Sequence, residues 1–233
     1  MYNIKLNSFS FSKYSNIIVN EISGLCPPGA TISTTKMGKD GTQYQGSTKN
    51  ERNIVINFSI INNVKETRKI MYKEIVVGDK TTVTIDNLTT TGYIETFELN
   101  NFQNITTGQI SIICPSSYFY GEEKTISLAS FVKFFNSEMK NDYVIQVVFS
   151  GSGNDFTYML NETNYTINYS FISGDTLTID SYNRKIYING KNKYSTKCWI
   201  KWGLIKKGKN SITYSSAANC SVNFIYQDRY LGI

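Results

Sequence analysis

Histidine is absent from the 233-residue sequence. This absence excludes Ser-His-Asp and Cys-His catalytic groups, imidazole general bases and most transition-metal sites. Carboxylate pairs, lysine nucleophiles and metals with oxygen ligands remain as options. The residue type that most enzymes use to move protons near neutral pH is therefore missing.

Cysteine is scarce, and long apolar runs are missing. Cys26, Cys114, Cys198 and Cys220 form no CxxC pair, so no zinc site is indicated. No run of about 18 apolar residues occurs, and Met1–Lys5 lacks the layout of a signal peptide. We predict that the chain does not insert into a membrane and that it is synthesised in a cytoplasm. The four cysteines could form two disulfides, but in a cytoplasm we expect all four thiols to be free.

The composition favours a mainly β protein. Ala and Leu are scarce, aromatics reach 14%, and Ile, Val, Thr, Asn and Ser are abundant. β-branched and aromatic residues suit a pleated, half-buried surface, whereas Asn and Ser suit turns. The length allows one large β domain or two smaller domains.

The first half of the chain predicts an α+β domain. Residues 53–61 alternate strictly between apolar and polar side chains, which indicates a strand that could extend a sheet to a neighbour. Residues 64–76 predict the one helix, and residues 37–50 predict a long loop or an exposed hairpin tip. Strands and Pro115 follow, so we place the domain at residues 1–118.

The second half predicts a β-sandwich. Short strand-like runs recur between turn residues, and no helix is indicated. Arg184–Gly190 reads as an alternating strand that enters an Asn-Gly hairpin turn. We place this domain at residues 119–233, with a polar linker near residues 116–125.

Two ordered sets of segments resemble the siphophage distal tail protein family. The N-terminal set is Ile22–Leu25, Pro28, Asp40-Gly41, Glu51–Ile54, the predicted helix and Ile112–Phe119. The C-terminal set is Gly174–Asp180, Arg184–Gly190, Leu204, Gly208–Asn210 and Tyr226–Ile233. The resemblance implies a split β-barrel-like ring domain followed by a galectin-like β-sandwich. Residues 121–160 match least well.

The resemblance also implies a structural role. Family members form a ring, usually of six copies, that joins the tail tube protein to a tail-associated lysin, a tail fibre or a receptor-binding protein. The expected location is the virion tail tip, after assembly in the host cytoplasm. A prophage or a phage-tail-like bacteriocin would use the same part. The alternative from another class is a galectin-like carbohydrate-binding module.

The resemblance points to the 37–53 segment as an arm that contacts a neighbouring subunit. Its predicted interface residues are Lys39, Asp40, Gly41, Tyr44, Glu51 and Arg52. Glu51 and Arg52 could pair across that interface, or they could be an ordinary solvated pair. A mobile surface loop is the alternative for the whole segment.

Residues 184–209 contain nine Lys or Arg and no Asp or Glu. This run predicts a surface that docks an acidic partner or an anionic cell-wall polymer. Its predicted residues are Arg184, Lys185, Lys191, Lys193, Lys206 and Lys207. A solvated lysine-rich face around core tryptophans is the alternative. We expect no specific nucleic-acid binding.

Two pairs of carboxylates are candidates for glycosidase chemistry, which needs only two such groups. Asp175 with Asp180 and Glu122 with Glu123 are close in sequence, but nothing fixes either pair across a cleft. We therefore expect turn and surface roles, no enzyme activity, no catalytic or metal residues and no cofactor.

Overall fold

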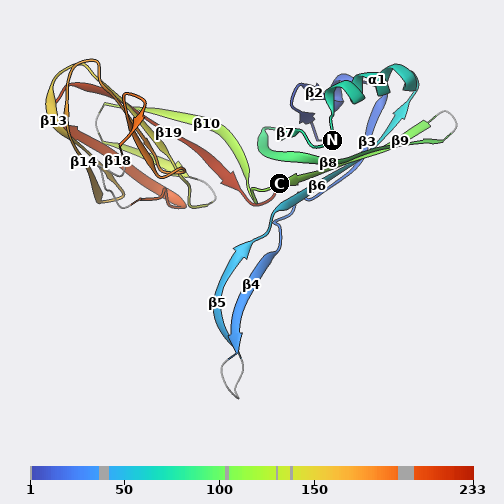
Figure 1. Cartoon of the computed structure of the whole chain (residues 1–233), viewed down its shortest axis with the longest axis horizontal. Coiled ribbons are helices and arrows are strands. Elements are labelled where there is room, and N and C mark those ends of the chain that lie inside the picture. Colours follow the sequence, from blue (N-terminus) through green and yellow to red (C-terminus); the bar gives the residue numbers. More distant parts are fainter. Residues whose placement is uncertain (1, 37–41, 103–104, 130, 137–138, 194–201) are drawn as a thin grey trace. The chain divides into compact units, whose positions relative to one another are not determined.

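The computed structural model describes residues 2–36, 42–102, 105–129, 131–136, 139–193 and 202–233. Strands dominate, and the described residues contain a single α-helix, which confirms the mainly β fold class. The chain divides into two compact units (Figure 1). The first comprises Met1–Tyr120 and Tyr230–Ile233, and the second comprises Gly121–Arg229.

One large sheet and a separate hairpin make up the first unit. The bounds are β1 (Ile4–Leu6), β2 (Phe9–Ser10), η1 (Phe11–Lys13), β3 (Ile17–Ser23), β4 (Ala30–Lys36), β5 (Thr42–Lys49), β6 (Arg52–Ile61), α1 (Val64–Glu74), β7 (Lys80–Ile85), β8 (Leu88–Phe102), β9 (Ile105–Cys114) and the start of β10 (Phe119–Leu128). The sheet order is β3-β6-β9-β8-β7-β1-β2. β4 and β5 pair with each other in a second, two-stranded sheet.

Strand β6 forms the centre of the core of this unit. Ile54, Ile56, Phe58 and Ile60 alternate with half-buried or exposed residues and are all 0% exposed. The period of two turns every second side chain to one face, so these four side chains meet in the core. β3 pairs along one edge of β6 and β9 along the other. The suggestion that this strand extends a sheet to a neighbour is therefore wrong, because both of its edges are occupied.

The helix lies where the sequence predicted it and ends two residues earlier. Met71 is 0% exposed and packs in the same core as β6. Thr67 is buried at the first turns, and the Asn16 amide donates a 2.8 Å hydrogen bond to its hydroxyl. The N–H of Ile75 closes the last turn on the carbonyl of Met71. Burial of one apolar face thus fixes the helix on the sheet.

The second unit contains two sheets around one core. The bounds are β11 (Val132–Asn136), β12 (Val144–Phe149), β13 (Gly153–Leu160), β14 (Thr163–Phe171), β15 (Thr176–Asp180), β16 (Lys185–Ile188), β17 (Lys191–Asn192), β18 (Gly208–Ser216) and β19 (Cys220–Tyr230). One sheet has the order β17-β16-β15-β12-β19-β10, and the other has the order β11-β18-β13-β14. Buried side chains from both sheets form the core, as in a β-sandwich. The described residues contain no helix here.

The segment expected as a polar linker is largely a strand. β10 begins at Phe119 and continues to Leu128, through the polar run at residues 121–125. The side chains of this run are mostly exposed, and β10 is hydrogen-bonded to β19 and β8 in the sheet. Independent folding of residues 1–118 and 119–233 stays a prediction. The last four residues, Tyr230–Ile233, lie with the first unit.

Candidate functional site

The β4–β5 hairpin is a two-stranded sheet of its own, and among the described strands it pairs with no other (Figure 1). Its described stem side chains, at residues 30–34 and 48–49, are all exposed, and Ile32 is 63% exposed. A two-stranded hairpin without a covered face is marginally stable in water. The hairpin therefore has the properties of an arm that another surface would cover.

The base of the hairpin is fastened by polar contacts. The Asn50 N–H donates to the Gly29 carbonyl at 2.9 Å, and the Thr31 hydroxyl donates to the Asn50 side chain at 2.8 Å. The Ser117 hydroxyl donates to the Asn50 carbonyl at 2.7 Å. The Lys49 ammonium lies 4.9 Å from the centre of the Tyr118 ring. The base is thus joined to the turn that follows β9.

Arg52 lies beside this base and is only 1% exposed. Its guanidinium donates hydrogen bonds to four backbone carbonyls, those of Gly24, Cys26, Ser117 and Leu231. The bonds to Cys26 and Ser117 measure 3.0 and 2.8 Å. Burial lowers the pKa of Arg52 from its usual value. The planar guanidinium is suited to joining chain segments that are remote in sequence.

The predicted interface residues differ in burial and in position. Arg52 is buried, and its guanidinium donates to carbonyls of its own unit; its place at a subunit interface stays a prediction. Glu51 is exposed, and its pairing with Arg52 across an interface stays a prediction. Tyr44 belongs to β5 and lies opposite Thr34. Lys39, Asp40 and Gly41 lie outside the described residues.

The predicted basic surface falls into two groups on the second unit. Arg184, Lys185, Lys191 and Lys193 belong to the β15–β16–β17 end of one sheet, whereas Lys206 and Lys207 immediately precede β18 of the other. Lys185 lies directly opposite Asp180 on β15. The fold thus places a carboxylate beside the first group, which the local sequence did not indicate.

Lys206 lines a recess of about 710 Å³ on the second unit. Other charged residues of the recess are Lys133, Lys209 and Glu162. Phe131 and Phe135 also line it, and both are more than half exposed. Lys133 and Phe135 of β11 and the preceding Phe131 were not among the predicted docking residues, because they belong to no run of charged residues in the sequence.

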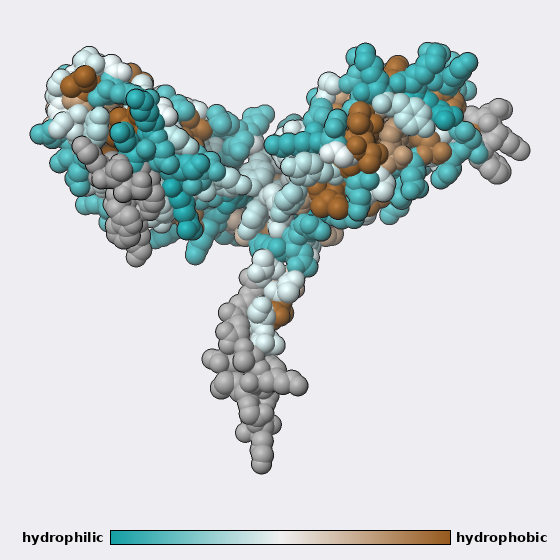
Figure 2. All heavy atoms as spheres, viewed as in Figure 1, coloured by the Kyte–Doolittle hydropathy of each residue, from teal (hydrophilic) through white to brown (hydrophobic). Residues whose placement is uncertain are grey.

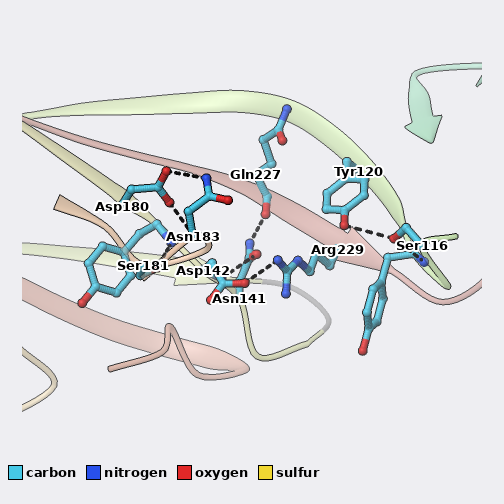
Figure 3. A network of polar contacts seen from close by, with 11 residues as sticks. Ser116, Tyr120, Asn141, Asp142, Asp180, Ser181, Asn183, Gln227 and Arg229 are labelled. Carbon is cyan, nitrogen blue, oxygen red and sulfur yellow. Dashed lines mark hydrogen bonds and ion pairs between the residues drawn. The ribbon is translucent and has the colours of Figure 1, made fainter. Parts of the chain in front are cut away.

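Asp175 and Asp180 accept hydrogen bonds within turns, whereas Glu122 and Glu123 are exposed residues of β10. Asp175 accepts hydrogen bonds from the Ile172 N–H at 2.9 Å and from the Asn189 amide at 2.7 Å. These bonds lower the pKa of Asp175 from its usual value. Asp180 accepts from the Asn183 N–H and amide (Figure 3). Within the described residues no group of three acidic or cysteine side chains could hold a metal ion.

Other features of the described residues bear on the sequence-based expectations. Asn189 and Gly190 have φ angles of +50° and +73°, as in the predicted hairpin turn. Cys26, Cys114 and Cys220 are free thiols, and Cys198 lies outside the described residues. No helix in the described part of the chain is long and apolar enough to cross a membrane.

The chain is similar to solved phage tail proteins along its whole length. It matches the crystal structure of the Dit (gp 19.1) protein of phage SPP1 with a TM-score of 0.78, at 15% identity, over 99% of both chains. That protein is described as a paradigm of the hub adsorption apparatus in Gram-positive-infecting phages. A chain of the phage P2 baseplate, in its activated conformation with calcium, matches over 100% of both chains with a TM-score of 0.58 at 7% identity.

The sequence comparisons point to the same family. No curated protein matches the chain. The family described as siphovirus-type tail component, C-terminal domain, matches residues 136–230, which cover most of the second unit. These residues include strands from both sheets of the sandwich. Residues 136–230 therefore match the siphovirus-type tail component C-terminal domain, and the fold of the whole chain is similar to that of the SPP1 Dit protein.

Proposed function

We propose that this chain is a structural hub protein that forms a homo-oligomeric ring in a phage tail tip. The carrying observation is the likeness to the SPP1 Dit fold over 99% of both chains. The ring would have six copies and join the tail tube protein to the host-adsorption apparatus, after assembly in the host cytoplasm. A tail-like bacteriocin would use the same ring.

The hairpin supports this proposal on physical grounds. Ile32 on its stem is exposed, and among the described strands β4 and β5 pair only with each other, while Asn50 and Ser117 hold its base firmly. A firm base reduces the entropy that the arm loses when it binds. In a closed ring each arm would meet a different patch on the next copy.

The first unit also exposes apolar side chains that a neighbour could cover. Val76 is 44% exposed and Val77 is 54% exposed, directly after α1. Figure 2 shows hydrophobic residues, in brown, on the visible face of this unit. Contiguous apolar surface of this kind marks interaction sites in soluble proteins. It adds a second surface that ring closure would bury.

A matched pair of variants tests the proposal. Ile32→Lys places a charge on the hairpin stem, and Ile172→Lys changes an equally exposed isoleucine, at 61%, in the second unit. We expect Ile32→Lys alone to shift the oligomer to monomer in light scattering, with an unchanged melting temperature. A strict monomer for the unaltered protein at high concentration in every salt condition would overturn the ring.

A further inference from the structure

The outer face of β11 presents an alternating aromatic and basic pattern. Phe131 and Phe135 are 51% and 61% exposed, and Lys133 lies between them in sequence. Lys133 and Phe135 lie two residues apart in β11 and therefore share one face of the strand, and Phe131, just before β11, is exposed as well. The Lys133 ammonium lies 5.7 Å from the centre of the Phe131 ring.

Strand β18 completes this surface. Lys209 lies directly opposite Phe135, and Ser211 lies directly opposite Lys133. Together with Lys206, these residues line the recess of about 710 Å³, where Glu162 is the only acidic lining residue described. Three ammonium groups against one carboxylate give the recess a net positive charge, which favours an anionic partner.

The amide groups of the recess are already occupied by bonds within the chain. Asn210 donates from its amide to the carbonyls of Lys206 and Gly208, and its side-chain oxygen accepts from the Lys206 N–H. Asn161 donates to Asn210 at 2.8 Å and accepts from the Ser211 N–H. The recess therefore offers few free amides for sugar hydroxyls. The groups that the recess offers to a partner are lysine ammonium groups and phenylalanine rings.

A buried asparagine network holds the segment that carries Lys206. The Asn136 amide donates to the Lys206 carbonyl at 3.0 Å, and the Asn141 N–H donates to the Ile205 carbonyl at 2.9 Å. The Asn141 side chain donates in turn to the Gln227 carbonyl of β19 (Figure 3). Because the backbone is fixed on both sides of Lys206, a partner meets a preformed surface.

β11 is an edge strand of its sheet. Among the described strands it pairs with β18 and with no other. An edge strand that exposes apolar side chains invites pairing with another chain, and proteins usually cover or charge such edges. Phenylalanine rings favour apolar side chains, and the flanking lysines favour carboxylates.

We propose that the β11–β18 surface, formed by Phe131, Lys133, Phe135, Lys206 and Lys209, docks an extended acidic segment of another protein. The segment would place apolar side chains over the two rings and carboxylates against the lysines. This chemistry differs from that of a sugar-reading site, which needs free amides and hydroxyls. The inference goes beyond the ring proposal, since the surface lies wholly on the second unit.

Peptide binding to the full chain tests this surface. The probe is a fluorescein-labelled ten-residue peptide that alternates Leu and Glu, and the readout is fluorescence anisotropy. We expect saturable binding that weakens about tenfold in the Lys133→Glu, Lys209→Glu double variant and about fivefold in Phe135→Ser. Lys65→Glu, on α1 of the first unit, should bind like the unaltered protein. Circular dichroism checks that each variant is folded.

Three results would overturn the proposal. The first is no saturable binding of the Leu-Glu peptide. The second is equal binding by all variants, which would mean attraction to overall charge. The third is equal binding of a Ser-Glu peptide and of polyglycerol phosphate with no effect of Phe135→Ser, which would assign the surface to an anionic polymer. A monomer in light scattering would argue against the ring but would change none of these peptide-binding results. The two proposals can therefore fail independently.

Discussion

The Nη2 atom of Arg52 lies 2.8 Å from the carbonyl oxygen of Ser117, 65 residues further along the chain. The same guanidinium reaches the Leu231 carbonyl, 179 residues away, at the C-terminal end. The hairpin base, the turn after β9 and the chain terminus therefore meet at one buried cation. Removal of that cation would leave several carbonyls without their donor.

Arg52→Met tests this arrangement, because methionine keeps much of the volume and removes every donor. We expect the first unit to lose about 3 to 5 kcal/mol of unfolding free energy, since the buried carbonyls lose their partners. Urea unfolding followed by circular dichroism measures the loss. Glu51→Ala, at the exposed neighbouring position, should stay within about 0.5 kcal/mol of the unaltered protein. Equal stability of both variants would contradict the role of Arg52.

Removal of Leu231–Ile233 should destabilise the first unit although these residues follow the second unit in sequence. The truncation deletes the Leu231 carbonyl that Arg52 binds and the bond from the Ile233 N–H to the Leu25 carbonyl. We expect a loss of about 1 to 3 kcal/mol. In Arg52→Met the same truncation should cost less, because the two changes remove a shared bond. Strict additivity in this double-mutant cycle would rule out the coupling.

Much of the fold could be predicted from local patterns. The alternation at residues 53–61 predicted β6, and the Asn189–Gly190 pair predicted its turn. The role of Arg52 could not be predicted, because its partners are carbonyls from segments remote in sequence, which carry no side-chain signal. β10 was missed because its polar run is exposed and lacks the apolar alternation that marks a strand; pairing within the sheet and the contact of Lys124 with Asp228 hold it. The β11 surface needed the register of β18 to bring Lys209 beside Phe135.

Tyr143 and Tyr158 should make the second unit sensitive to alkali. Their hydroxyls lie 2.8 Å apart in the core, and burial raises the pKa of both well above the usual value. Above about pH 10 the unfolded chain releases protons that the folded unit retains, so stability falls as pH rises, by about 1.4 kcal/mol per pH unit for each group. Unfolding midpoints between pH 9 and 11 measure this slope.

Two variants test which groups cause this fall of stability with pH. Tyr143→Phe with Tyr158→Phe removes both buried hydroxyls together and should flatten the alkaline loss of stability. Tyr182→Phe changes a tyrosine that is 64% exposed and should leave the slope unchanged. An identical slope in the double variant and the unaltered protein would show that other groups control alkaline unfolding.

Two of the free thiols should differ strongly in reactivity. Cys26 is exposed, whereas Cys114 is buried and burial raises its pKa to about 11. At pH 8 the thiolate fraction of Cys114 is then about a hundredfold lower than that of a thiol with a pKa near 9. Alkylation with iodoacetamide, followed by peptide mass spectrometry, should label Cys26 first and Cys114 only after unfolding. Equal rates would show that the Cys114 site opens readily.

Gly24→Ala compared with Gly78→Ala separates steric contact from backbone strain. Both glycines have positive φ angles, +82° and +88°, which cost an alanine about 1 kcal/mol. A Cβ atom at Gly24 would lie 1.9 Å from the Asn53 carbonyl oxygen, whereas one at Gly78 would meet nothing within 4 Å. Gly24 also supplies a carbonyl to Arg52, so any backbone shift there weakens the buried hydrogen bonds. We expect Gly24→Ala to cost at least about 3 kcal/mol and Gly78→Ala about 1 kcal/mol in urea unfolding. Equal losses would mean that the chain relaxes around Gly24, and the close approach of residues 24 and 53 would then not constrain the hairpin base.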